Sequence, residues 1–341
     1  MLSEPKIRGL LLEEAVLHLL RKAGYTPVYG RGSDPTLEEN GYSLFVIGRG
    51  ERHQIDAIAD YLIQPPFSNP QRLLVEAKFY DDRQVGLTVV RNALGVLVDV
   101  SQHFVAPPPP GLRKKRYHYQ YAVVSATRFT RQSQRYAYAQ DIFLIPLGDS
   151  AFFRPLLRAV RKAARELHSH PLNVQNQQFS GRLRARIRRS LSPDAPQNPE
   201  LELSGIRQTT FDEFVTECHQ IGYVLLAVTA SGFPIFLTPR EHVDLAELES
   251  TTHVRIYRSE NAWYLGRSRN DQLFSFDIPT ELVRLYGAAG ELSPSRALDL
   301  KWDELRSLTA TVIDGEAVRV VRFRLDVPWF RAVREHIHPN E

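Results

Sequence analysis

The apolar positions in the first half of the chain alternate between helix spacing and strand spacing. From Ile7 to Ala23 they recur at the three-to-four-residue interval of an amphipathic helix, and Gly24 follows as a helix-ending residue. Short aliphatic runs predict strands at about 42–48, 54–63, 72–79, 119–125 and 141–145. Further helices are predicted over 85–100, 131–140 and 150–170. This order predicts an α/β domain built around a mixed central sheet that is flanked by helices.

The pattern of apolar and polar positions changes in the second half of the chain, where it predicts shorter strands and more turns. Residues 190–204 are rich in Pro, Asn and Ser, which is typical of a linker. Strands are predicted at 223–229, 233–237, 253–258, 262–267 and 273–277, between helices at about 210–221 and 280–287 and before a hairpin and helix over 309–336. The pattern therefore predicts a first domain over 1–150, a basic helix, Arg-rich segment and linker over 151–204, and a second α+β domain over 205–341.

Composition narrows the class of protein. The chain has 341 residues, of which 43% are hydrophobic, and no apolar run reaches the roughly 18 residues of a membrane span. Cys218 is the only cysteine, which excludes an internal disulfide and a cysteine-based zinc site. The first residues lack the order of charges and apolar residues that marks a signal peptide. We therefore expect a cytoplasmic protein without a membrane partner.

The charges are unevenly distributed. Residues 1–191 carry 28 Lys and Arg against 16 Asp and Glu, whereas residues 192–341 carry 15 against 23. A basic half beside an acidic half indicates that the first half alone faces a polyanion such as DNA.

Three of the charged residues in the apolar strands at about 54–63 and 72–79 are candidates for chemistry. Glu76 and Lys78 share one face of their strand because strand side chains alternate, and Asp56 lies in the preceding strand. Removing such groups from water is costly unless they are paired or hold a metal. Asp56, Glu76 and the backbone carbonyl of Ala77 offer the hard oxygen ligands that suit Mg²⁺. The alternative interpretation is an ion pair at the end of a strand.

Several segments together resemble a known family. They are Leu12-Glu13-x-x-Val16-x-x-Leu19-Leu20-x-x-x-Gly24-Tyr25, Ile55-Asp56, Val75-Glu76-Ala77-Lys78, Val85-Gly86-x-x-Val89-Val90-Arg91-x-x-x-Gly95, Ala122 to Thr130, and Ile142 to Ile145. Over about residues 7–150 the chain resembles the Mrr-type branch of the PD-(D/E)XK, restriction-endonuclease-like nucleases. The resemblance implies a restriction-endonuclease-like fold, a divalent cation and hydrolysis of phosphodiester bonds in DNA.

The resemblance also implies roles for particular residues. Asp56, Glu76 and Lys78 match the catalytic trio, and Glu13 matches the acid of the first helix that helps to hold metal or water. Glu76 stands where Gln is common in this branch, which restores the general superfamily pattern. Helical spacing places Glu13 on or beside the buried stripe, and places Glu14 on the solvent-facing side.

Basic residues supply candidate DNA contacts. Gln84, at the expected start of the helix over 85–100, is a candidate phosphate contact, with an ordinary helix start as the alternative. Two Arg- and Lys-rich clusters are the other candidates: Arg113, Lys114, Lys115 and Arg116, followed by three tyrosines, and Arg182, Arg184, Arg186, Arg188 and Arg189. The alternatives are a solvated loop for the first cluster and a contact with the acidic second half for the other.

These observations favour a metal-dependent DNA endonuclease that uses Mg²⁺, with Mn²⁺ as a substitute. A role in restriction or anti-phage defence follows from the resemblance alone. One alternative is a nuclease effector that is silent until a partner or ligand activates it. Another is a non-catalytic DNA-binding protein that keeps a nuclease fold. Residues 205–341 would serve recognition, regulation or oligomerisation, and the partners expected are DNA and either a second copy or a defence-system protein.

Overall fold

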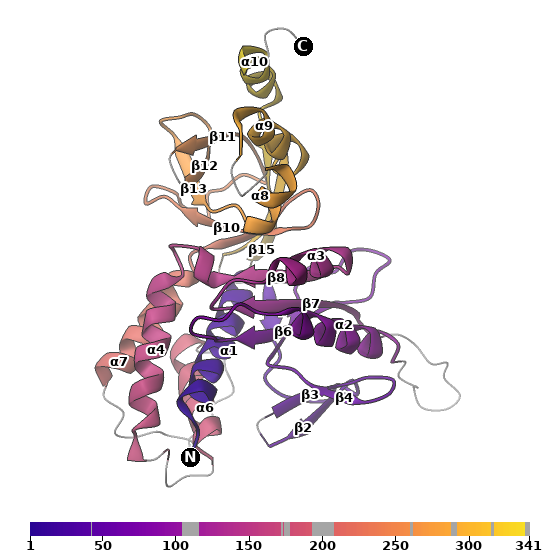
Figure 1. Ribbon diagram of the computed structural model, residues 1–341, viewed down its shortest axis with the longest axis vertical. Coiled ribbons are helices and arrows are strands. Elements are labelled where there is room, and N and C mark those ends of the chain that lie inside the picture. The colour runs from indigo at the N-terminus through magenta and orange to yellow at the C-terminus, as the bar shows by residue number, and fades with distance from the viewer. Residues whose placement is uncertain are drawn as a thin grey trace. The chain divides into compact units, whose positions relative to one another are not determined.

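The structure is a computed structural model that describes residues 1–41, 43–103, 116–171, 173, 178–192, 208–259, 262–287, 292–314 and 317–337 (Figure 1). The chain divides into two compact units. The first comprises Met1–Arg21 and Tyr25–Gly222, and the second comprises Lys22–Gly24 and Tyr223–Glu341. The division therefore falls after Gly222, whereas the sequence pattern placed the start of the second domain at residue 205. Most of the expected linker over 190–204 lies outside the described residues.

The first unit contains these helices and strands, in chain order. They are α1 (Glu4–Lys22), β1 (Tyr25–Pro27), β2 (Leu37–Asn40), β3 (Ser43–Ile47), β4 (Arg52–Gln54), β5 (Ala57–Tyr61), β6 (Gln71–Lys78), α2 (Leu87–Ser101), β7 (His118–Ser125), α3 (Arg131–Ala139), β8 (Ile142–Pro146), the short 3-10 helix Leu147–Asp149, α4 (Arg154–His168), α6 (Phe179–Leu191) and α7 (Gln208–Ile221). In Figure 1 α2 and α3 lie on one side of the unit, and α1, α4, α6 and α7 group on the other.

The central sheet has the strand order β1-β5-β6-β7-β8. The pairs β6–β7 and β7–β8 are parallel, and β5 runs antiparallel to both β1 and β6. Leu73, Leu74 and Val75 are all buried, because parallel strands covered on both faces need a continuous apolar run. Helices α2 and α3 cover the face that carries Leu74 and Val123. The predicted mixed sheet flanked by helices is thus present.

Two boundaries differ from the sequence prediction. Helix α2 begins at Leu87 rather than near Gln84, because Val85 is held extended in a bridge to Phe129. The sequence also suggests a hairpin between the strands at 42–48 and 54–63, around the turn at 48–51, whereas in the structure β3 pairs with the short strand β4, which ends before Asp56. The chain forms a separate small sheet, β2-β3-β4, and then passes into the central sheet as β5.

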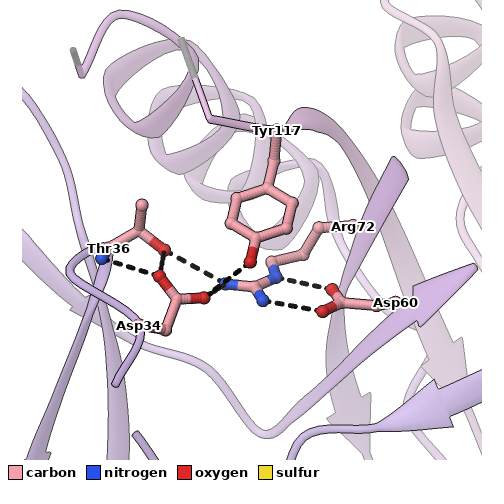
Figure 2. Close-up of polar contacts among 5 residues, drawn as sticks. All are labelled: Asp34, Thr36, Asp60, Arg72 and Tyr117. Atoms are coloured by element: carbon pink, nitrogen blue, oxygen red, sulfur yellow. Dashed lines mark hydrogen bonds and ion pairs between the residues drawn. The ribbon is translucent and has the colours of Figure 1, made fainter. Parts of the chain in front are cut away.

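A buried arginine joins the loop before β2 to the central sheet (Figure 2). Arg72 of β6 has a side chain that is 2% exposed, and its guanidinium bonds both carboxylate oxygens of Asp60 at 2.6 and 2.8 Å. It also lies 2.8 Å from Asp34 and 3.1 Å from the hydroxyl of Thr36. The ring of Tyr117 covers the guanidinium, 3.6 Å from its centroid. These contacts satisfy a charge that would otherwise be costly to bury.

The small sheet is tied to α2 by a second polar contact. Asp99 of α2 accepts a hydrogen bond of 2.8 Å from the backbone N–H of Gly50, in the turn between β3 and β4. The Nε2 atom of His53 lies 2.8 Å from the other carboxylate oxygen of Asp99. The small sheet is therefore tied to α2 through Asp99, and to the central sheet through the loop of Asp34 and Thr36 that contacts Arg72.

The second unit is a closed barrel. Its strands are β9 (Leu225–Val228), β10 (Pro234–Pro239), β11 (Thr251–Ser259), β12 (Ala262–Gly266), β13 (Gln272–Phe276), β14 (Ser307–Asp314) and β15 (Ala317–Leu325). They close in the order β10-β13-β12-β11-β15-β14-β9, in which only the pairing of β11 with β15 is parallel among the described pairs. Inward-facing side chains such as Leu265, Phe274 and Phe323 fill its core.

Three helices accompany the barrel strands among the described residues of the second unit. They are α8 (Thr280–Tyr286), α9 (Pro294–Asp303) and α10 (Val327–Ile337). Helix α9 was not predicted, although its start carries a recognisable signal. Ser293 accepts a hydrogen bond from the backbone N–H of Arg296, and Pro294 occupies the first helical position.

No helix among the described residues is long and apolar enough to cross a membrane.

Candidate nuclease site

Asp56 lies where the chain passes from the small sheet into the central sheet. It falls between β4 and β5, one residue before Ala57 pairs with Val75 of β6. One carboxylate oxygen, Oδ2, accepts a hydrogen bond of 2.9 Å from the backbone N–H of Ala77. The pairing of Ala57 with Val75, together with this hydrogen bond, therefore fixes Asp56 next to the end of β6, where Glu76 and Lys78 lie.

Glu76 and Lys78 lie on one face of β6, as alternation along the strand predicts. Each side chain is 26% exposed, and the ammonium of Lys78 donates a hydrogen bond to Oε1 of Glu76. The hydroxyl of Tyr121, on the neighbouring strand β7, donates to Oε2 of Glu76 at 3.4 Å. Both oxygens of Glu76 thus have a contact, and the structure brings the predicted carboxylate and ammonium together. Tyr121 was not predicted here, since nothing in its local sequence marks it.

The surroundings of Asp56 raise its pKa strongly. Burial is the largest cause, and the negative charges of Glu13 and Glu76 add to it, so that together they raise the pKa of Asp56 to about 7. Burial acts in the opposite direction on Lys78, but attraction to Glu76 prevails and raises the pKa of the ammonium. The site concentrates negative charge that a cation would neutralise.

Glu13 reaches the same region from α1. Its side chain is 14% exposed, and Arg184 of α6 donates a hydrogen bond to its Oε2 atom. Burial raises the pKa of Glu13, and the attraction of Arg184 offsets part of that rise. Glu13 and Asp56 line one small cavity of about 40 Å³ together with Arg184, which is room for roughly two or three water molecules.

The prediction for Glu14 is wrong. Its side chain is 1% exposed and accepts hydrogen bonds of 2.8 Å from Arg184 and from both Nε and Nη2 of Arg188. His18, one helical turn after Glu14, is buried as well. The reason is that α6 covers the side of α1 that the helical pattern left for solvent.

The residues present fit a magnesium ion. Among the described residues, no three His, Cys, Asp or Glu side chains form a group that could hold a metal by themselves. Mg²⁺ does not require such a group, because it binds through one or two carboxylates and keeps several waters. Asp56 and Glu76 would supply two carboxylates from adjacent strand ends, and a bound cation would relieve the repulsion between their charges. The role of the Ala77 carbonyl stays a prediction.

The predicted loop contacts for DNA are only partly described. Gln84 is exposed and precedes α2, so it does not begin the helix as expected. Arg113, Lys114 and Lys115 lie outside the described residues, and Arg116 is exposed. The tyrosines that follow do not form a stacking surface: Tyr117 covers Arg72, and Tyr119 and Tyr121 are buried.

The arginines of α6 divide by helical phase. Arg184 and Arg188, one turn apart, point to the acids of α1, and Arg188 also lies over the ring of Tyr29 at 4.5 Å. Arg186 lies over the ring of Phe211 at 4.8 Å, and Arg189 is exposed. Arg182 is partly exposed, with its Nε atom buried. The five arginines therefore do not share one exposed face, and their part in DNA binding stays a prediction.

Comparison with known proteins agrees with this fold. Residues 6–149 match the Mrr_cat family model, described as a restriction endonuclease. No curated protein matches the chain. A crystal structure of a protein of unknown function, AF1548, is similar at 16% identity over 62% of this chain and 98% of its own, with a TM-score of 0.35, which is too slight a likeness to support any statement about fold or function.

Proposed function

Since residues 6–149 belong to the restriction-endonuclease family of Mrr type, we propose that this protein is a metal-dependent DNA endonuclease. The observation that carries the proposal is the convergence of two carboxylates and one ammonium at adjoining ends of β5 and β6. Asp56 is bonded to the backbone of Ala77, and Glu76 is bonded to Lys78. The alternative of a simple ion pair leaves Asp56 unexplained, because its carboxylate has no cationic hydrogen-bond partner among the described side chains.

The reaction proposed is hydrolysis of a phosphodiester. Water adds across one P–O bond, which leaves a phosphate monoester on one strand end and a hydroxyl on the other. Asp56, Glu76 and the Ala77 carbonyl would hold Mg²⁺, or Mn²⁺ in its place. When bound, the cation polarises a phosphoryl oxygen and lowers the pKa of an attacking water.

The chain's own groups have distinct parts in this proposal. Lys78 would stabilise the charge that builds on the phosphate in the transition state, since its ammonium is held beside Glu76, one of the carboxylates proposed to bind the cation. Tyr121 orients Glu76 through the second oxygen of that carboxylate. The Ala77 N–H holds the orientation of Asp56. Glu13 would hold the cation or a water in the cavity that it shares with Asp56.

The wider role rests on resemblance and charge. Mrr-type nucleases commonly act in restriction or anti-phage defence, and we extend that role to this chain, together with a cytoplasmic location that suits its single, buried cysteine. The basic first 191 residues would face the DNA backbone. The barrel unit would supply recognition, regulation or dimer contacts, either with a second copy or with a defence partner.

Incubation with supercoiled plasmid DNA tests this function. The wild-type protein is expected to nick or linearise the plasmid with Mg²⁺ or Mn²⁺ and to leave it intact with a chelator. Asp56→Ala should abolish cleavage while its circular dichroism spectrum matches that of the wild type. Equal cleavage with and without a divalent cation, or by Asp56→Ala, contradicts the proposal.

A further inference from the structure

Arg184 stands between two acids of α1, and only one of them faces the candidate site. Its Nη1 atom donates to Glu14 at 2.8 Å and its Nη2 atom donates to Glu13. Arg184 and Arg188 both line the small cavity that contains Glu13 and Asp56, so it is the bond to Glu13 that distinguishes Arg184. Arg184 belongs to α6, which lies outside the segment that matches the nuclease family.

Arg188 provides a natural contrast. It is on the same helix face one turn later, and its side chain is 21% exposed against 20% for Arg184. Its two hydrogen bonds both go to Glu14, through Nε and Nη2 at 2.8 Å. Arg188 therefore anchors α6 to α1, whereas Arg184 alone of the two also engages Glu13.

The two bonds of Arg184 differ in what breaking them would cost. If Arg184 released Glu13, the bond to Glu14 would remain and the guanidinium would not be stranded without a partner, which is the expensive outcome for a buried charge. Only one bond needs to be exchanged. A divalent cation that binds Glu13 competes for that bond, because the same carboxylate charge cannot fully serve two cations.

We propose that Arg184 is a built-in counter-ion of the metal site, which holds Glu13 until a divalent cation displaces it. The inference rests on the proposed nuclease function and adds a regulation to it: α6 sets the metal concentration at which the site fills. Arg184 acts through Glu13, so it is a positioning residue and not a catalytic one. From the sequence this arginine was a candidate for contacting DNA or the acidic second half, and its bonds to the acids of α1 support this different part.

Titration calorimetry with Mn²⁺ on the full chain, without DNA, tests the inference. Arg184→Met is expected to tighten Mn²⁺ binding about tenfold, the change that one charge-assisted hydrogen bond typically makes in an equilibrium constant. Arg188→Met removes a similar cation but leaves Glu13 engaged, so its affinity should stay within about twofold of the wild type. Asp56→Asn should abolish the site in every background.

A double substitution guards against an effect of altered folding. In Glu13→Gln there is no carboxylate at position 13 for which Arg184 and Mn²⁺ could compete. Adding Arg184→Met to this variant should therefore not increase its Mn²⁺ affinity further. Thermal unfolding in chelator shows whether each variant is folded before titration. If Arg184→Met leaves Mn²⁺ affinity unchanged or weaker while Asp56→Asn abolishes it, the counter-ion role is overturned and the metal site stands. If the wild type binds no Mn²⁺, or Asp56→Asn binds it equally, the proposed function and this inference fail together.

Discussion

Replacing Glu14 by Gln should destabilise the first unit more than any other single change to an acid of α1. The substitution keeps the volume and removes the charge that Arg184 and Arg188 share. Truncating one member of a buried ion cluster commonly costs 3–5 kcal/mol, because the remaining charges lose their compensation. Glu14 is 1% exposed, but the two arginines keep about a fifth of their exposure, and Arg184 retains Glu13. We therefore expect the lower end, about 3 kcal/mol.

Urea unfolding followed by circular dichroism measures this cost, and a matched control lies on the same helix. Glu4→Gln removes an acid that is 32% exposed and lies 3.8 Å from Arg8 one helical turn later, and an i,i+4 helix pair contributes about 0.3–0.5 kcal/mol. All three tryptophans fall within 223–341, so tryptophan fluorescence follows the second unit separately. If Glu14→Gln costs no more than Glu4→Gln, the account of the α1–α6 contact is wrong.

Three further outcomes follow from other parts of the structure. Arg72→Lys cannot form the paired bonds to Asp60, so the free energy of unfolding should fall by about 2–4 kcal/mol in thermal denaturation. An unchanged melting midpoint would contradict the cluster of Figure 2. Burial raises the pKa of Asp34, but hydrogen bonds from Thr36 prevail and lower it, so the charged form contributes stability above the ordinary carboxyl pKa that is lost as pH falls below it. Asp34→Asn should lack this acid-dependent loss in urea unfolding at stepped pH, and an identical pH profile would contradict it. DNA affinity of the full chain, measured by fluorescence anisotropy, should fall at least tenfold between about 50 and 200 mM salt, and a flat response would exclude a phosphate-binding surface.

The central sheet and its charged strand were predictable because they depend on local pattern. The apolar run around Glu76 and Lys78 can only be a covered strand, and alternation along it puts the two charges on one face. The link of Asp56 to Ala77 needed tertiary structure, since it depends on the register of β5 against β6. The bond from Tyr121 to Glu76 likewise depends on the register of β7.

Errors arose where a distant segment changes what is buried. Helical spacing put Glu14 in solvent, and this would hold for an isolated amphipathic helix, but α6 arrives from 170 residues away to pair with it. The same long-range contact turned Arg184 from a surface residue into part of the candidate site. The closure of the barrel in the second unit was not predictable for the same reason. The parallel pairing of β11 with β15 joins residues about 70 positions apart, and no local pattern connects them.

The central claim is that Glu76 belongs to a site that hydrolyses DNA, and single-turnover cleavage of supercoiled plasmid by Glu76→Ala at saturating Mn²⁺ tests it most directly. Loss of one such electrostatic group typically lowers the rate about 10²–10³-fold, and we expect at least that much, since Glu76 would hold the cation in the proposed site and is bonded to Lys78. Unfolding in urea should be close to that of the wild type, because the side chain lies at a partly exposed strand end. Cleavage by Glu76→Ala at the wild-type rate would contradict the account.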